Sequence, residues 1–97
     1  MARKLIFDPS IPADLANAVT YYDSISAKLA DRFRANVDRR LHDIAAHPES
    51  FPADVPPIRF AKIERFPYLI FFKAYENHVS VIAVLHGSSN PERWRNR

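Results

Sequence analysis

The 97-residue sequence contains no cysteine and a single glycine, Gly87. Without cysteine there is no disulfide framework, no thiolate nucleophile and no cysteine-built metal site. The loops that cradle nucleotide phosphates need several glycines, so that class of site is excluded as well. His42, His47 and His78 fall on different predicted elements without the spacing of metal ligands. We therefore expect neither a metal nor a cofactor.

Long apolar runs are also missing from the chain. The N-terminal region has two basic residues but only a three-residue apolar run, Leu5–Phe7. This is too short for the core of a signal peptide or for a membrane span. The absence of cysteine suits a reducing compartment. We expect a soluble cytoplasmic protein.

Apolar residues are plentiful in short runs, because 47% of the chain is hydrophobic and 12% is aromatic. A chain of this length has one core, so we expect a single domain over residues 1–97. Residues 1–58 carry seven Lys/Arg against eight Asp/Glu, whereas residues 59–97 carry seven against three. This asymmetry favours an anionic partner for the C-terminal part, either nucleic acid or an acidic protein segment. An ordinary solvated basic face is the alternative.

The N-terminal half predicts a strand and two helices. Lys4–Phe7 is a short edge strand that Asp8-Pro9 ends. Ser10 caps a helix that ends near Asp23, with an apolar stripe at spacings of three and four residues. Ser26 caps a second helix over about Ala27–Ala46. The short connection makes the two helices an antiparallel hairpin.

The C-terminal part predicts three antiparallel strands and a short tail. Four prolines between residues 48 and 57 indicate a link in which neither helix nor strand pairing continues. The predicted strands are Ile58–Arg65, Tyr68–Tyr75 and His78–His86, with a hairpin turn at Glu76-Asn77. Residues 88–90 can cap a last helical turn over 91–94. The fold class is α+β.

This order of elements resembles the RelE/ParE superfamily of toxins from bacterial type II toxin–antitoxin modules, in its ParE-like, plasmid-stabilisation branch. The resemblance covers nearly the whole chain. The residues that carry it are Asp14-Leu15, Ala18, Tyr21-Tyr22, Leu29, Phe33, Leu41, Ile44, His47-Pro48, Arg65-Phe66-Pro67-Tyr68, Val84-Leu85-His86, Pro91 and Trp94-Arg95.

The resemblance implies a growth-inhibiting toxin that a cognate antitoxin neutralises. ParE-like members bind and trap DNA gyrase without being hydrolases. RelE-like members cut messenger RNA on the ribosome without a metal. A toxin fold that has lost its activity and only binds its partner is a third possibility.

Candidate site residues follow from both readings. Those that can contact a macromolecular target are Arg59, Lys62, Arg65, Arg93, Trp94 and Arg95. For metal-free ribonuclease chemistry, the acid or base would be His86, with cations from Arg59, Lys62 and Arg65. His86 can equally be a strand-end residue that fixes the tail, and Trp94 can fold back onto the sheet.

The apolar strands favour the gyrase reading over the nuclease. RelE-like nucleases resemble one another in basic central strands and a late tyrosine, whereas Tyr68–Phe72 and Val79–Leu85 are almost wholly apolar and no tyrosine follows His86. We expect the antitoxin to bind by strand addition, at an edge near Leu5–Phe7 or Arg59–Ile63, or as a helix in a groove beside the helix hairpin.

Overall fold

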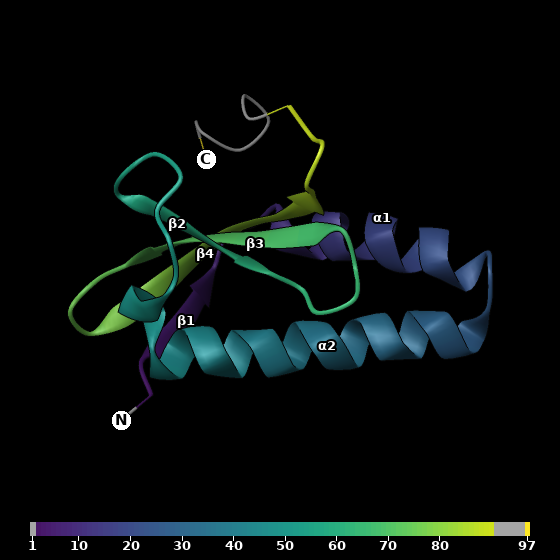
Figure 1. Cartoon of the computed structure of the whole chain (residues 1–97), viewed down its shortest axis with the longest axis horizontal. Helices are drawn as coiled ribbons and strands as arrows, with labels where there is room; N and C mark the ends of the chain where they lie inside the picture. The colour runs from purple at the N-terminus through teal and green to yellow at the C-terminus, as the bar shows by residue number, and fades with distance from the viewer. Residues whose placement is uncertain (1, 91–96) are drawn as a thin grey trace.

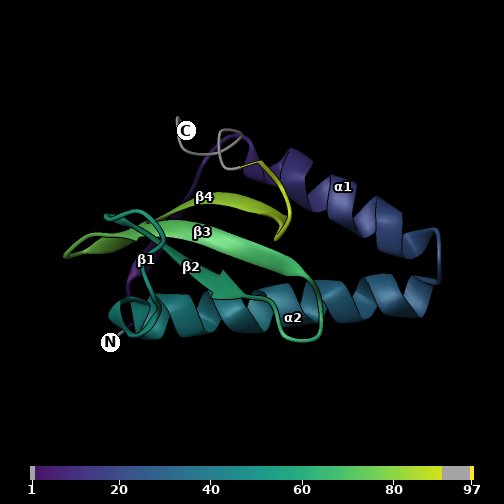
Figure 2. The same ribbon diagram turned by 45° about the horizontal axis from the view of Figure 1, so that its top comes forward.

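The computed structural model describes residues 2–90 and 97. It places two helices, α1 (Ile11–Asp23) and α2 (Ala27–Ala46), against a four-stranded sheet (Figure 1). The two helices diverge from their short connection at residues 24–26 (Figure 2). The predicted α+β class and helix hairpin are confirmed.

The sheet is mixed, with the strand order β1-β4-β3-β2. Strands β2 (Ile58–Lys62), β3 (Tyr68–Ala74) and β4 (His78–His86) form the predicted antiparallel part. The N-terminal strand β1 (Lys4–Phe7) extends the same sheet by pairing in parallel with β4. The edge position predicted for β1 is confirmed. Its parallel partner was not predicted, because pairing between distant segments leaves no local signal.

The strand β2 is shorter than the predicted Ile58–Arg65. Arg65 has a φ of 70°, a left-handed conformation that cannot continue a strand. The chain therefore turns over residues 63–66, where the Phe66 N–H donates to the Ile63 carbonyl at 3.2 Å, and Phe66 enters the core. Strand β4 carries an irregularity opposite Phe71 and Phe72, where the pairing register shifts. Both of its faces remain buried from Val81 to Leu85.

Helix α2 has the predicted bounds and cap. The Leu29 backbone N–H donates to the Ser26 hydroxyl at 3.0 Å, which satisfies one of the free donors of the first turn. Ser10 precedes α1 as predicted but makes no side-chain cap. Its hydroxyl and its N–H both donate to the Asp8 carboxylate, and these bonds hold the pKa of Asp8 below its ordinary value.

The main core lies between the helices and the sheet, and aromatic rings fill one end of it. The Tyr22 ring lies 5.1 Å from Phe33 and 4.9 Å from Phe66, centroid to centroid. Tyr22 belongs to the core, since only 6% of the residue is exposed. A second apolar cluster occupies the opposite face of the sheet and includes Ile58, Phe71 and Leu85.

The proline-rich link is more regular than the sequence predicts. Pro48–Ser50 forms a 3₁₀ turn, and Ala53 makes an isolated bridge with Arg59. The expectation that neither helix nor strand pairing would continue there is wrong. Proline restricts only its own position and the residue before it, so Ala53, between prolines 52 and 56, is free to pair.

Candidate functional site

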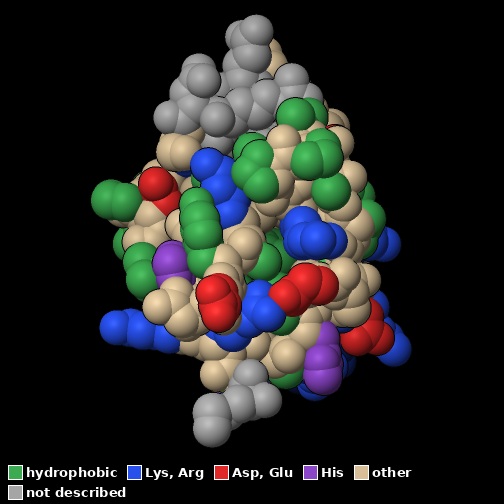
Figure 3. Space-filling model, turned by 90° about the vertical axis from the view of Figure 1, so that its left-hand side faces the viewer, with side chains coloured by type: hydrophobic (Ala, Val, Ile, Leu, Met, Phe, Trp, Pro, Cys, Tyr) green, Lys and Arg blue, Asp and Glu red, His purple; other side chains and the backbone are tan. Residues whose placement is uncertain are grey.

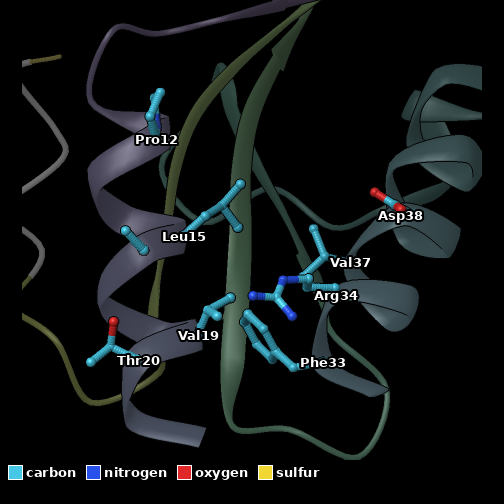
Figure 4. Close-up of a pocket in the computed structure, with 9 residues that line it drawn as sticks. Pro12, Leu15, Val19, Thr20, Phe33, Arg34, Val37 and Asp38 are labelled. Atoms are coloured by element: carbon cyan, nitrogen blue, oxygen red, sulfur yellow. The ribbon is translucent and has the colours of Figure 1, made fainter. Parts of the chain in front are cut away.

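A hollow opens between α1 and α2 where the helices diverge. Its volume is about 580 Å³. Figure 4 shows Leu15 and Val19 of α1 directed across it toward Val37 and Phe33 of α2. The residues that line it are Pro12, Leu15, Ala16, Val19, Thr20, Phe33, Arg34, Val37 and Asp38. We call this hollow the interhelix groove.

The interhelix groove has apolar walls and a charged rim. Leu15 and Val19 are only partly buried, although they belong to the apolar stripe of α1. Arg34 at the rim pairs with Asp31 at 3.1 Å, and Asp38 lies one turn further along α2. The groove can therefore accept an apolar helical face with polar residues at its margins.

The two edges of the sheet differ in how accessible they are to an additional strand. The outer edge of β1 has no strand beside it among residues 2–90 and 97, and Ile6 and Phe7 are each 46% exposed. Residues 52–54 cover part of the outer edge of β2. The Phe60 N–H donates to the Pro52 carbonyl at 3.1 Å, and the Asp54 N–H donates to the Ile58 carbonyl at 3.0 Å. The edge at β1 is the more open one.

The structure does not bring Arg59, Lys62 and Arg65 together as one basic cluster. Arg59 lies beside Phe72 on the helix-covered face of the sheet, whereas Lys62 lies beside Leu69 on the opposite face. The Arg59 guanidinium donates to the Phe51 carbonyl at 2.6 Å, which fixes the proline-rich link. Arg65 lies apart from both, in the turn between β2 and β3.

His86 ends β4 and is exposed, with its ring 5.4 Å from the Tyr68 ring. The Ser88 N–H donates to His86 Nδ1 at 3.1 Å, so the neutral ring carries its proton on Nε2. Tyr68 is half buried, and burial followed by the nearby Tyr21 raises its pKa. Among the described residues, Arg59, Lys62 and Arg65 make no hydrogen bond with the His86 side chain.

Asp14 is a buried carboxylate whose structural role was not predicted from the sequence. It is 6% exposed on the sheet-facing side of α1. Its Oδ2 accepts the Val84 N–H at 3.0 Å and Arg97 Nη1 at 2.7 Å, while Arg97 Nη2 donates to Oδ1 at 3.3 Å. The available signal was its position in the apolar stripe, three residues after Ile11 and four before Ala18.

Arg93, Trp94, Arg95 and the expected helical turn over 91–94 lie outside the described residues. Within the described part of the chain, no three His, Asp or Glu side chains gather as a metal site would require. Neither helix in that part is long and apolar enough to cross a membrane.

Comparison with known proteins agrees with this arrangement. One solved structure, described as the chromosomal ParDE TA system from P. aeruginosa, matches 88% of this chain and 96% of that chain, with a TM-score of 0.75. At 16% sequence identity this likeness concerns the fold. No match was found among curated proteins. Residues 5–91 match the family described as the ParE toxin of the type II toxin–antitoxin system, parDE. The chain therefore belongs to the ParE toxin family.

Proposed function

We propose that this toxin arrests growth by binding DNA gyrase and that a cognate antitoxin neutralises it. Membership of the ParE family over residues 5–91 carries this proposal. The protein acts by occupying its target, and Arg65, Lys62 and the tail residues Arg93, Trp94 and Arg95 are its proposed contacts. These residue types are frequent in the energetically important part of interfaces.

The antitoxin contributes an amphipathic helix to the interhelix groove. Leu15, Val19 and Val37 supply the apolar walls that such a helix needs, and the charged rim fixes its orientation. An extended segment of the same antitoxin adds to the sheet at β1, because that edge is open and carries the exposed Ile6 and Phe7. Binding at both places covers apolar surface that would otherwise promote aggregation.

The arrangement of the candidate catalytic residues supports a binding role over RNA cleavage. Metal-free cleavage needs an acid, a base and cations around one phosphate. Arg59 and Lys62 lie on opposite faces of the sheet, and Arg59 is engaged with the Phe51 carbonyl. The face away from the helices is apolar at its centre, where Phe71, Ile82 and Leu85 pack.

A supercoiling assay tests the proposal. Purified toxin is titrated into gyrase acting on relaxed plasmid, with and without the antitoxin encoded beside the toxin gene. We expect loss of supercoiling and trapped cleaved DNA, both reversed by the antitoxin. Supercoiling that persists at a large molar excess of toxin rejects gyrase as the target.

Ribosome-dependent RNA cleavage is the second candidate, and the exposed His86 beside Tyr68 is the observation that favours it. Mapping of cuts in translated messages after toxin expression tests it, with His86→Ala and Lys62→Ala as variants. Cuts that disappear in His86→Ala support cleavage, and intact messages during growth arrest remove it. Expression that leaves growth unchanged points instead to an inactive, partner-binding protein.

A further inference from the structure

A second hollow lies on the other flank of α2, between this helix and the turn that joins β2 to β3. Its volume is about 390 Å³. It is lined by Leu29, Arg32, Asn36, Arg39, Glu64, Arg65 and Phe66. We call it the arginine hollow, because three of these seven residues are arginines contributed by two separate elements.

The turn that carries Arg65 is held firmly in place. Asn36 Nδ2 donates to the Glu64 carbonyl at 2.9 Å, and Arg40 Nε donates to the Lys62 carbonyl at 2.9 Å. Phe66 is anchored in the aromatic core, 5.2 Å from Phe33. These contacts hold Arg65 in a left-handed conformation that glycine adopts more easily. The turn thus carries an arginine at a position whose left-handed conformation favours glycine.

The cations around the arginine hollow are weakly compensated. Arg39 approaches Glu64 only to 3.9 Å. Arg32, Arg65 and Lys28, which lies one helical turn before Arg32, form no ion pair among the described residues. The end of the molecule seen in Figure 3 is different, because positive and negative side chains alternate there and Arg3 pairs with Glu49. Three cations without an ion pair among the described residues, Lys28, Arg32 and Arg65, therefore lie close together beside α2.

We propose that the arginine hollow binds the phosphate backbone of duplex DNA. Guanidinium groups form charge-assisted and bidentate hydrogen bonds with phosphates. The row from Lys28 to Arg39 spans about 17 Å along the helix, which equals the rise of about five base pairs along the axis of duplex DNA. Arg65 adds a cation beside this row. The result is a line of positive charge that matches a line of negative charge.

The apolar part of the arginine hollow argues against two other ligands. Its one aromatic residue, Phe66, is only 5% exposed, so it offers no platform for the stacking of unpaired bases. An acidic peptide would find only the partly buried Leu29 as an apolar anchor there, whereas the interhelix groove offers both Leu15 and Val19. This proposal does not rest on gyrase as the target and can stand if that target is rejected.

The salt dependence of DNA binding tests the proposal. Binding of the purified toxin to a fluorescent 24-base-pair duplex is measured by anisotropy between 50 and 200 mM salt. We expect each of Arg32→Ala, Arg39→Ala and Arg65→Gly to lower the slope of log K against log salt by about 0.9. Between 50 and 200 mM salt, the affinity of the triple variant for DNA should then fall by a factor about 40 times smaller than that of the wild type. Glycine is chosen at position 65 because it keeps the left-handed turn.

Matched controls remove the same charge elsewhere. Lys4→Ala on β1 and Lys73→Ala on β3 should leave the slope unchanged. A slope that falls as much in these controls, or that stays unchanged in the triple variant, overturns the proposal. An acidic peptide that binds more tightly than the duplex and depends on the same arginines also overturns it. Independently of any variant, NMR shifts caused by DNA in the wild-type protein should map to residues 28–39 and 64–66, and shifts confined elsewhere reject the site.

Discussion

Asp14 shows how a single carboxylate joins three parts of the chain. From α1 it accepts the N–H of Val84 in β4 and pairs with Arg97. The Asp14 side chain is 5% exposed and that of Arg97 is 20% exposed, so water screens this pair weakly. Arg97 also donates to the Ile82 carbonyl at 3.3 Å. The carboxylate therefore compensates both a backbone donor and a cation.

We expect Asp14→Ala to lower the free energy of unfolding by about 3 kcal/mol, because it leaves a buried N–H unsatisfied and a cation unpaired. Asp14→Asn retains an acceptor for Val84 and should cost about half as much. Chemical denaturation measures both changes, and a double-mutant cycle with Arg97→Ala isolates the ion pair. Equal losses for the two variants at position 14 would contradict a role for the Val84 bond.

We expect the hydroxyls of Tyr22 and Tyr68 to make the folded state less stable at alkaline pH. Burial raises the pKa of both hydroxyls above 10.0, with smaller contributions from neighbouring tyrosines. The folded state then keeps these protons to higher pH than the unfolded state does. The two hydroxyls contribute their full stabilisation of the folded state below pH 10. This stabilisation is lost as pH rises through the pKa values that the hydroxyls have in the folded state.

Melting temperatures from pH 8 to 11 test this linkage. Tyr22→Phe and Tyr68→Phe should each flatten the decline above pH 10, whereas Tyr75→Phe serves as the control because Tyr75 is 46% exposed. If the melting temperature of Tyr22→Phe falls as steeply with pH as that of the wild type, the Tyr22 hydroxyl does not contribute to the loss of stability in alkali.

At the scale of elements, the cap at Ser26 fixes where α2 begins. Ser26 is extended, and its hydroxyl accepts the Leu29 N–H at 3.0 Å. Ser26→Ala should cost about 1 kcal/mol and lower the melting temperature by several degrees. Ser26→Asp supplies another good cap and should restore most of this loss. A melting temperature unchanged in Ser26→Ala would contradict the cap's contribution.

The helices could be predicted closely from sequence because their signals are local. Apolar residues recur every three or four positions, and Ser26 and Pro48 lie just outside the ends of α2. The strand pairing was harder. β1 and β4 are separated by seventy residues, and only the folded chain shows that Leu5 lies beside Val79. The end of β2 depended on the left-handed Arg65, which most residue types would avoid.

The candidate site could be predicted only in part. The open edge at β1 and a groove beside the helices followed from apolar patterning, since partly buried Leu15 and Val19 continue the stripe of α1. The separation of Arg59 from Lys62 follows from strand alternation once β2 is assigned. The contact between Arg59 and the Phe51 carbonyl depended on the path of the link.

At the scale of the whole molecule, α2 separates two surfaces of different chemistry. Phe33 and Val37 line the apolar interhelix groove on one flank, while Arg32 and Arg39 line the arginine hollow on the other. Two partners on these flanks approach from different sides of the helix. An antitoxin helix in the groove therefore leaves the arginine hollow accessible. The toxin within such a complex would retain its proposed contact with DNA.

Blocking the interhelix groove should separate neutralisation from toxicity. Ala16 lines the groove and is exposed, so Ala16→Arg places a long charged side chain in it without disturbing the core. Ala13→Arg makes the same change on α1 at an exposed position that does not line the groove. We expect Ala16→Arg to arrest growth even when the antitoxin is co-expressed, with antitoxin affinity reduced at least tenfold. Ala13→Arg should remain neutralised. If the antitoxin rescues both variants equally, its helix binds elsewhere, and the open edge at β1 becomes the principal contact.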